Sequence, residues 1–435
     1  MAKKRYVQVG VGSRARFFYG AIASKYKETS EILAFCDINK TRMEYANNLL
    51  VNTYGYENPV PMYTPDEFDK MIEEQKPDYV IVTSIDRTHH KYIKRAMELG
   101  CDVISEKPMT MDMEKCNEIL DAIEKTGREL RVTFNYRYAP HNSKIRELIM
   151  NDTIGKVNQV HFEWCLNTSH GADYFRRWHR DKKNSGGLMV HKSTHHFDLV
   201  NFWLGTYPET VYAQGGLKFY GRENAEDRGV TKFYTRTHGS ENAIGDPFAF
   251  TMAGNELLES MYLNAEHEDG YIRDQSVFGD NISIEDTMNV LVTYNSGAVM
   301  SYSLNAYSPI EGFNVVFTGT KGRMELNVRE KAYVNGSGAQ SDEGATETKR
   351  LVVYPMFDEA YEVEIEKGEG GHGGGDDILR EDIFGNPEAD PLNRAASHVD
   401  GVSSILTGIC ANKSMASGMP VKVEDVLGRK FKDLK

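Results

Sequence analysis

The first glycine-rich turn of the chain constrains the fold more than any other feature. An apolar run over residues 5–9 ends at Gly10 and Gly12, and a predicted helix carrying Ala15 follows. A second apolar run, closed by Asp37, reads as the next buried strand. Glycines here permit a tight turn and the close approach of a pyrophosphate to the helix N-terminus. The pattern predicts a β-α-β unit that binds a dinucleotide.

Asp37 refines this prediction. A carboxylate at the end of the second strand can bind the ribose diol of NAD, whereas the 2′-phosphate of NADP would face its negative charge. NAD is therefore the expected cofactor. The alternative, which the glycine triplet alone leaves open, is a tight turn in a sheet that binds no ligand.

Strands and helices alternate as far as residue 134, and the pattern then changes. Alternation predicts a doubly wound parallel sheet over 1–134. Beyond it, a helix over 188–204 and long strands at hairpin spacing predict a second α/β domain over 135–435 with an antiparallel sheet. Residues 220–285 read as a long surface insertion in this domain, and 335–348 as an exposed loop.

Charge and cysteine content exclude several classes of partner. The 435 residues carry a net charge of −13, which opposes sequence-independent binding to nucleic acid or anionic membranes. The five cysteines are scattered and form no C-x-x-C motif, which favours a reducing compartment. No secretion signal or apolar run of about 18 residues is present. We expect a soluble, cytoplasmic protein.

Lys107 is the first candidate for catalysis. It follows a short predicted strand and Glu106, and ligands of parallel sheets bind beyond the carboxyl ends of their strands. The alternative is a solvated Glu/Lys pair at a strand end.

His191 and His195 are the next candidates. Their spacing of four places them on one face of the helix predicted over 188–204, beside Lys192. A neighbouring cation can keep an imidazole neutral and able to act as a base, although histidines on such helices are usually structural. Two histidines at this spacing could also bind a metal ion, but no glutamate lies between them and Lys192 would repel it. We expect no metal.

These motifs together resemble the glucose–fructose oxidoreductase/inositol dehydrogenase (Gfo/Idh/MocA) family in order and spacing. The segments that carry the resemblance are Gly10–Ala15, Glu106-Lys107-Pro108, Gly186-Gly187 leading to His195 and Asp198, Glu285-Asp286-Thr287, and Gly319 to Gly322. The resemblance implies an N-terminal Rossmann domain and a C-terminal α/β domain with a large open, mostly antiparallel sheet. It also implies an NAD-dependent oxidoreductase that forms a homo-oligomer, either a dimer or a tetramer.

The resemblance also assigns residues to roles. Lys107 and His195 are similar to the family's catalytic lysine and histidine, with His191 orienting the substrate or relaying a proton. The expected cofactor-binding residues are Gly10, Gly12, Ser13, Arg14, Asp37, Ser84, His89, Glu106 and Lys107. The expected substrate-binding residues are Arg137, Tyr138, Trp178, His179 and Lys192.

The chain departs from the family at three places. His191 stands where the family commonly has an aspartate, four residues before the catalytic histidine. Ile85 replaces the family's usual proline, which argues against a cofactor contact at the neighbouring Asp86. The glycine run that contains His372 reads as a flexible hinge or, alternatively, as a loop that presents His372 to the site.

The sequence therefore favours an NAD-dependent oxidoreductase acting on a sugar, glycoside or polyol. His195 would remove the hydroxyl proton and Lys107 would stabilise the developing alkoxide. Two alternatives stay open. One is a redox-neutral NAD-dependent glycosidase that works through transient oxidation at C3 and elimination. The other is a non-catalytic protein whose binding of a partner responds to a dinucleotide.

Overall fold

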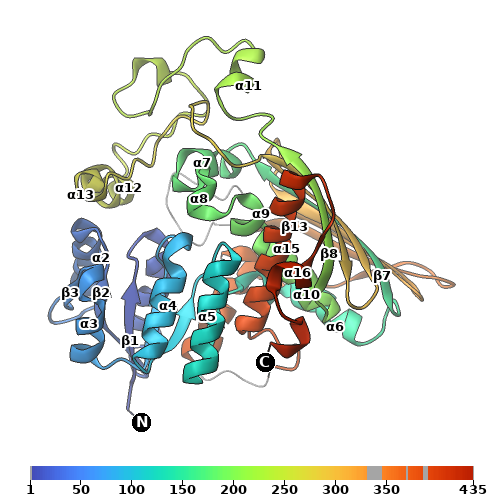
Figure 1. The fold of residues 1–435 in the computed structure, drawn as a ribbon, viewed down its shortest axis with the longest axis horizontal. Coiled ribbons are helices and arrows are strands. Elements are labelled where there is room, and N and C mark those ends of the chain that lie inside the picture. Colours follow the sequence, from blue (N-terminus) through green and yellow to red (C-terminus); the bar gives the residue numbers. More distant parts are fainter. Residues whose placement is uncertain (1, 331–344, 369–370, 386–389, 435) are drawn as a thin grey trace.

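A six-stranded parallel sheet forms the core of the N-terminal domain (Figure 1). The computed structural model describes residues 2–330, 345–368, 371–385 and 390–434. The strand order is β3-β2-β1-β4-β5-β6, and the interior of each central strand is fully buried because helices cover both faces. The strands are β1 Lys4–Val9, β2 Ser30–Cys36, β3 Met62–Tyr63, β4 Tyr79–Val82, β5 Asp102–Ser105 and β6 Leu130–Val132. The helices, with 3₁₀-helices labelled η, are η1 Ser13–Ala15, α1 Arg16–Ala23, α2 Lys40–Asn52, η2 Pro65–Glu67, α3 Phe68–Gln75, η3 Asp86–Thr88, α4 His89–Glu98 and α5 Met113–Thr126. The predicted Rossmann sheet is confirmed.

A nine-stranded sheet forms the core of the C-terminal domain, which is the larger part of the chain, in the order β14-β13-β12-β11-β7-β10-β9-β8-β15. β10 runs parallel to β7, and the other pairs are antiparallel. The strands are β7 Val157–Asn167, β8 Pro208–Gly216, β9 Thr287–Tyr294, β10 Val299–Ser308, β11 Gly312–Gly319, β12 Gly322–Glu330, β13 Thr346–Pro355, β14 Tyr361–Val363 and β15 Val421–Lys422. Buried and exposed residues alternate along β9 and β10, so one face is covered and the other is open. The predicted large, mostly antiparallel sheet is confirmed.

Helices of the second half cover one face of this sheet and fill the space beside the parallel sheet (Figure 1). They are η4 Asn135–Tyr138, α6 Pro140–Met150, α7 His170–Arg176, η5 Trp178–Arg180, α8 Lys182–Ser185, α9 Leu188–His191, α10 Ser193–Leu204, η9 His372–Gly374, α14 Gly375–Phe384, α15 His398–Ser417, α16 Val423–Leu427 and η10 Phe431–Asp433. None of the described helices is both long and apolar enough to cross a lipid bilayer.

The helix predicted over 188–204 is divided into α9 and α10, with Lys192 between them. The two pieces are fixed to different elements: His191 at the end of α9 bonds Asp86, whereas Ser193 at the start of α10 bonds the hydroxyl of Tyr302 on β10. The predicted helix is thus interrupted at Lys192, but Lys192 keeps right-handed helical backbone angles, and His191 and His195 line the same pocket.

The segment 220–285 joins β8 to β9 and reaches over the N-terminal sheet, above α2 in Figure 1. It contains only short helices, which are α11 Arg222–Asp227, η6 Glu241–Ala243, α12 Glu256–Met261, η7 Leu263–Ala265 and α13 Glu266–Asp269. Most of the loop predicted over 335–348 lies outside the described residues, but β13 already begins at Thr346.

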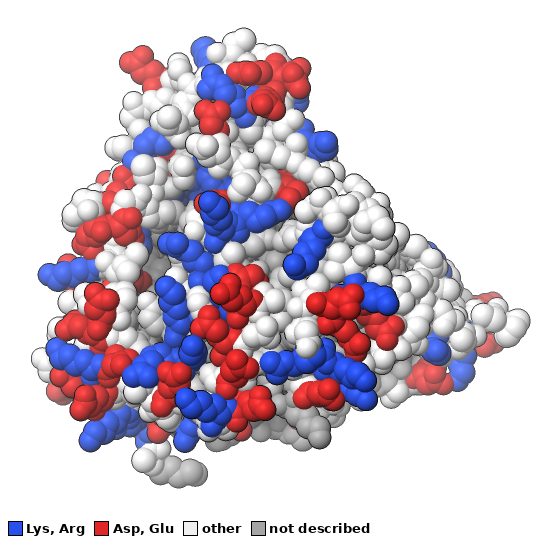
Figure 2. Space-filling model, viewed as in Figure 1, with Lys and Arg blue, Asp and Glu red and all other residues white. Residues whose placement is uncertain are grey.

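Acidic and basic side chains are interspersed over the face drawn in Figure 2. This mixture, together with the net charge of −13, gives that face no large field of one sign with which to attract a polyanion.

Candidate active site

One pocket of about 920 Å³ lies between the carboxyl ends of the parallel strands and the second half of the chain. Its walls include the glycine-rich turn, Asp37, Lys107, His191 and His195. The topology brings these residues together because β1, β2, β4 and β5 all end at the same edge of the sheet. The pocket therefore contains both the predicted dinucleotide motif and the predicted catalytic groups.

Gly10 shows why the turn needs glycine. Its φ is +82°, and a Cβ there would lie 2.4 Å from the backbone nitrogen of Ser84. A larger residue would be strained and would push β1 away from the loop after β4. Gly10 and Gly12 themselves line the pocket.

Asp37 is held at the edge of the pocket by its neighbours. Its carboxylate accepts hydrogen bonds from the backbone N–H groups of Val11 at 2.5 Å and Asn39 at 2.8 Å. Burial nevertheless raises its pKa above the usual value. Each oxygen keeps a lone pair, so the carboxylate remains able to accept a hydrogen bond from a ribose diol. Asp37 and the glycine turn thus fit NAD.

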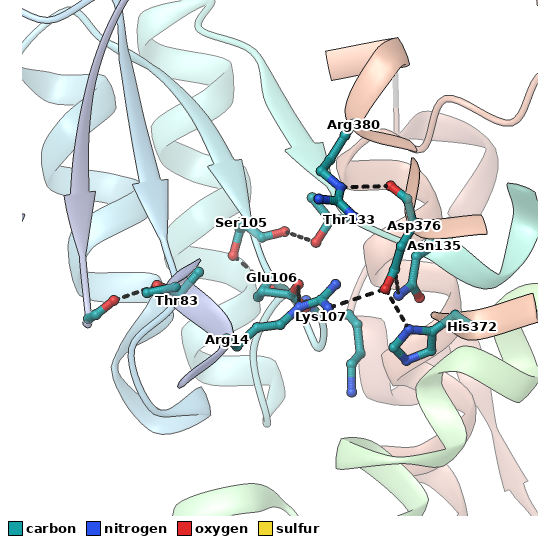
Figure 3. Close-up of polar contacts among 12 residues, drawn as sticks. Arg14, Thr83, Ser105, Glu106, Lys107, Thr133, Asn135, His372, Asp376 and Arg380 are labelled. Carbon is teal, nitrogen blue, oxygen red and sulfur yellow. Dashed lines mark hydrogen bonds and ion pairs between the residues drawn. The ribbon is translucent and has the colours of Figure 1, made fainter. Parts of the chain in front are cut away.

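Arg14 and Glu106 tie the turn to the end of β5. Arg14 donates from Nε to Glu106 at 2.7 Å, and Glu106 also accepts from the backbone N–H of Lys107 at 3.1 Å (Figure 3). Ser13 lies in the pocket wall and donates its N–H to the hydroxyl of Tyr262 at 3.0 Å. All four residues line the pocket, as the cofactor prediction expects.

Ser84 and His89 line the same wall but bond mainly to protein groups. The ring nitrogens of His89 lie 2.9 Å from the carbonyl oxygens of Pro108 and Ser84. Because both nitrogens face backbone carbonyls, His89 fixes the two loops and offers no nitrogen to a ligand. Its contact with the cofactor stays a prediction, which its place in the pocket wall allows.

Lys107 projects into the pocket beyond β5 (Figure 3). Burial lowers the pKa of its ammonium group to about 8, while Glu106 acts in the opposite direction. Its Nζ lies 3.5 Å from the carbonyl oxygen of His191. A partly desolvated cation of this kind can stabilise an alkoxide that forms beside it.

His195 is 3% exposed and lies in the first turn of α10. Burial, with Lys107 and Lys192 nearby, holds its pKa well below the usual value, so the imidazole is neutral at neutral pH. A neutral imidazole beside a cationic lysine has the protonation state that a general base needs.

His191 is paired with Asp86, which the sequence analysis left out of the site. Asp86 begins η3, is 3% exposed, lines the pocket and lies 2.5 Å from Nδ1 of His191. Burial raises the pKa of Asp86 to about 7 and lowers that of His191 well below its usual value. A carboxylate therefore does reach His191, but it comes from η3, which follows β4, rather than from α9. Nothing local in the sequence indicates the pairing, because 105 positions separate the residues.

Trp178, His179 and Lys192 line the pocket next to His191. The rings of Trp178 and His179 are stacked with centroids 3.7 Å apart, and His179 lies 4.3 Å from the ring of His191. Lys192 is 2% exposed and lies above the rings of Tyr136 and Trp164. This wall offers an aromatic face and several polar groups to a ligand.

Arg137 and Tyr138 are not part of the pocket wall, which corrects their predicted role. The guanidinium of Arg137 is 2% exposed and bonds Asp198 at 2.5 Å and Asp400 at 2.8 Å. The hydroxyl of Tyr138 donates to Asp382 at 2.8 Å. Each polar group is bonded to a carboxylate within the fold, so these residues stabilise the domain. Their neighbour Asn135 is the one that lines the pocket.

His372 lines the pocket. The structure thus agrees with the second interpretation of the glycine run, a loop that presents His372 to the site, rather than with the flexible hinge that the sequence favoured. His372 has a φ of +50° and lies 3.0 Å through Nδ1 from the carboxylate of Asp376. Asp376 also accepts from Asn135 at 2.7 Å and lies 3.8 Å from Arg14 (Figure 3). His372 is thereby fixed 6.3 Å, ring to ring, from His195.

A second buried chain of polar groups reaches the pocket through Tyr174, which sequence reasoning missed. His170 lies 2.7 Å from Glu311 and 3.0 Å from the hydroxyl of Tyr174. Burial raises the pKa of Glu311 to about 8. No motif marks these residues, because Glu311, just before β11, meets α7 only in the folded chain. Among the described residues, no group of three potential metal ligands converges.

Comparison with known proteins identifies this architecture. Residues 4–134 match the oxidoreductase family, NAD-binding Rossmann fold (GFO_IDH_MocA), and residues 146–423 match its C-terminal alpha/beta domain. A protein of Bacillus subtilis (strain 168), named as oxidoreductase YteT, is 35% identical over 97% of this chain and 98% of its own length. The D-glucoside 3-dehydrogenase of Escherichia coli (strain K12) is 32% identical over 62% of this chain and 74% of its own.

Solved structures share the fold. The WlbA dehydrogenase from Bordetella pertussis in complex with NADH and UDP-GlcNAcA has a TM-score of 0.62 at 17% identity, covering 97% of this chain and 99% of the other. The sequence matches span both halves of the chain, and the Rossmann half holds the NAD site. The chain belongs to the Gfo/Idh/MocA family of NAD-dependent oxidoreductases.

Proposed function

We propose that the protein oxidises a hydroxyl group of a sugar, glycoside or polyol, or catalyses the reverse reduction. The observation that carries the proposal is the convergence of Lys107, His191 and His195 with the glycine-rich turn on one pocket. The stacked face of Trp178 and His179 supports a carbohydrate, whose C–H face packs on rings while its hydroxyl groups bond polar side chains. Relatives named as D-glucoside 3-dehydrogenase and inositol 2-dehydrogenase support the same class.

The residues divide the chemistry between them. The glycine turn and Asp37 would hold NAD, which would supply the hydride acceptor for the carbinol carbon. His195 removes the hydroxyl proton, because burial keeps its imidazole neutral. Lys107 stabilises the negative oxygen that results. His191, oriented by Asp86, bonds the substrate or passes the proton onward.

The test is to incubate the pure protein with NAD and a panel of sugars, glycosides and polyols, and to follow NADH absorbance and aglycone release together. We expect NADH in proportion to oxidised product. Aglycone release without net NADH would contradict the proposal and favour the redox-neutral glycosidase. Binding of NAD with neither product, across the whole panel, would favour a non-catalytic role.

A further inference from the structure

The end of the pocket near Asp37 is built partly by the insertion. Residues 255–273 of the insertion, which we name the clasp, contain α12, η7 and α13. Clasp residues in the pocket wall are Leu257, Leu258, Met261, Tyr262, Asp269, Tyr271 and Arg273. They face Ile38, Arg42 and Tyr45, which follow Asp37. The clasp therefore closes the end of the pocket where an adenosine is expected from the position of Asp37.

Polar contacts join the clasp to the start of α2. Glu268 accepts hydrogen bonds from the backbone N–H of Lys40 and from the N–H and hydroxyl of Thr41, the last at 2.5 Å. Asn39 donates its side-chain amide to the carbonyl of Ala265 at 3.0 Å. These bonds satisfy amide groups at the N-terminus of α2 that have no partner within the helix.

Arg42 is also held by the clasp. It donates to the carbonyl of Met261 at 3.0 Å and pairs with Asp269 at 2.6 Å. A cation this close to Asp37 would otherwise be available to a 2′-phosphate. With Arg42 neutralised by Asp269, the clasp adds to the preference for NAD.

Tyr262 brings the clasp to the glycine-rich turn. Its hydroxyl accepts the N–H of Ser13 at 3.0 Å, at the helix start where a pyrophosphate is expected. Arg273 lies 4.8 Å above the Tyr262 ring, and both residues line the pocket. Burial alone would raise the pKa of Tyr262, but Arg273 and Arg177 lower it below its usual value. The hydroxyl thus lies in a positive environment that suits a phosphate.

The clasp packs as a unit of its own. Met252, Met261 and Tyr262 form a small apolar cluster that is separate from the two main cores. Its links to the N-terminal domain are the polar contacts to Ser13 and to residues 39–42, together with the packing of Tyr45 of α2 against the cluster. Such an element can separate from α2 without unpacking either core.

We propose that the clasp is part of the NAD site and closes over the adenosine end of the bound dinucleotide, which leaves only after the clasp lifts from α2. This inference rests on the NAD site of the family but not on the identity of the carbohydrate. Tyr262 is a phosphate-binding residue in the closed form. Glu268 is a positioning residue, since it lies outside the pocket wall and acts through α2.

Dissociation of NADH, measured by stopped-flow fluorescence with excess NAD as competitor and no carbohydrate, tests the clasp. The variants are Tyr262→Phe and Glu268→Gln. The matched control is Tyr234→Phe, because Tyr234 belongs to the same insertion but bonds Asp246 outside the pocket. We expect dissociation about tenfold faster in both clasp variants, since one hydrogen bond to a charged group contributes about that factor. The control should stay within about twofold of the parent protein.

Glu268→Gln separates closure from direct binding. Loosening the clasp should accelerate both association and dissociation, so the Kd changes less than either rate. Hydrogen exchange gives a second measurement: NAD should slow exchange in 255–273 more than in 222–246. Equal dissociation rates in the parent protein and both variants, or exchange in 255–273 that NAD leaves unchanged, would overturn the proposal. Thermal unfolding of each variant checks that it is folded. If the protein binds NAD but turns over no carbohydrate, only the proposed function is refuted, and the proposal for the clasp stands.

Discussion

The two ends of the pocket are built in different ways. At the end that we propose to be catalytic, Lys107, His191 and His195 lie on or shortly after regular elements, and no more than 84 positions separate Lys107 from His191. At the adenosine end, Ser13 and Tyr262 meet although 249 positions separate them. The catalytic end depends on motifs within the two domains, and the adenosine end depends on an insertion that crosses from one domain to the other. Substitutions at the two ends should therefore affect different steps.

The largest effect is expected at the catalytic end. Lys107→Ala and His195→Ala should each lower kcat by about 10²-fold or more, because each removes an acid–base or electrostatic group. Steady-state assays on a verified substrate measure the loss. NADH affinity should stay within about twofold, and the double variant should lose less than the product of the two effects if the residues act as a unit. Near-normal turnover in either variant would exclude that residue from the mechanism.

Asp86→Asn should lower kcat by about tenfold or more. The amide keeps the size of the side chain but removes the charge that orients the Nδ1–H of His191. Rates measured across pH should also show a displaced acidic limb. As a control, Asp66→Asn changes an aspartate within the 3₁₀-helix η2, outside the pocket. Equal kcat in Asp86→Asn and the control would mean that the pair only supports the fold.

The pH profile should be bell-shaped. Burial raises the pKa of Asp86 to about 7, so its pair with His191 gains a proton, and loses function, as pH falls through that value. Burial lowers the pKa of Lys107 to about 8, so its positive charge is lost as pH rises through that value. Activity should fall about tenfold per pH unit on each side. Lys107→Arg keeps a charge at alkaline pH, and an unchanged alkaline limb in that variant would contradict the assignment.

At the adenosine end, Asp37→Ser should narrow the preference for NAD over NADP by about tenfold, since it removes the repulsion of a 2′-phosphate. Titration of both cofactors by fluorescence measures the ratio. Turnover at saturating NAD should change much less than the ratio. Tighter binding of NADP than of NAD by the parent protein would refute the prediction itself.

The smallest effect is expected for Tyr138→Phe, which tests a residue that the family resemblance placed in the site. Its hydroxyl bonds Asp382 and lies outside the pocket wall. The substrate KM should change by less than about twofold, and the free energy of unfolding should fall by about 1 kcal/mol for the lost hydrogen bond. A large increase in KM with unchanged stability would return Tyr138 to the site.

Sequence alone determined the parts of this protein that depend on local order. The glycine turn, the buried strand before it and Asp37 lie within one β-α-β unit, so their spacing specifies their geometry. The strand periodicity of the second half likewise indicated its antiparallel sheet. Lys107 and His195 could be named because each belongs to a motif with a fixed position in such a fold.

Only the tertiary structure decided which groups these residues meet. The Asp86–His191 pair, the Glu311–His170–Tyr174 chain and the clasp on α2 each join segments that are remote in sequence. The same applies to Arg137, whose sequence neighbours suggested a substrate contact but whose charge is used by Asp198 and Asp400. The periodicity of apolar residues indicates on which face of a helix or strand a side chain lies. The partner of a buried charge, by contrast, depends on which distant elements pack against it.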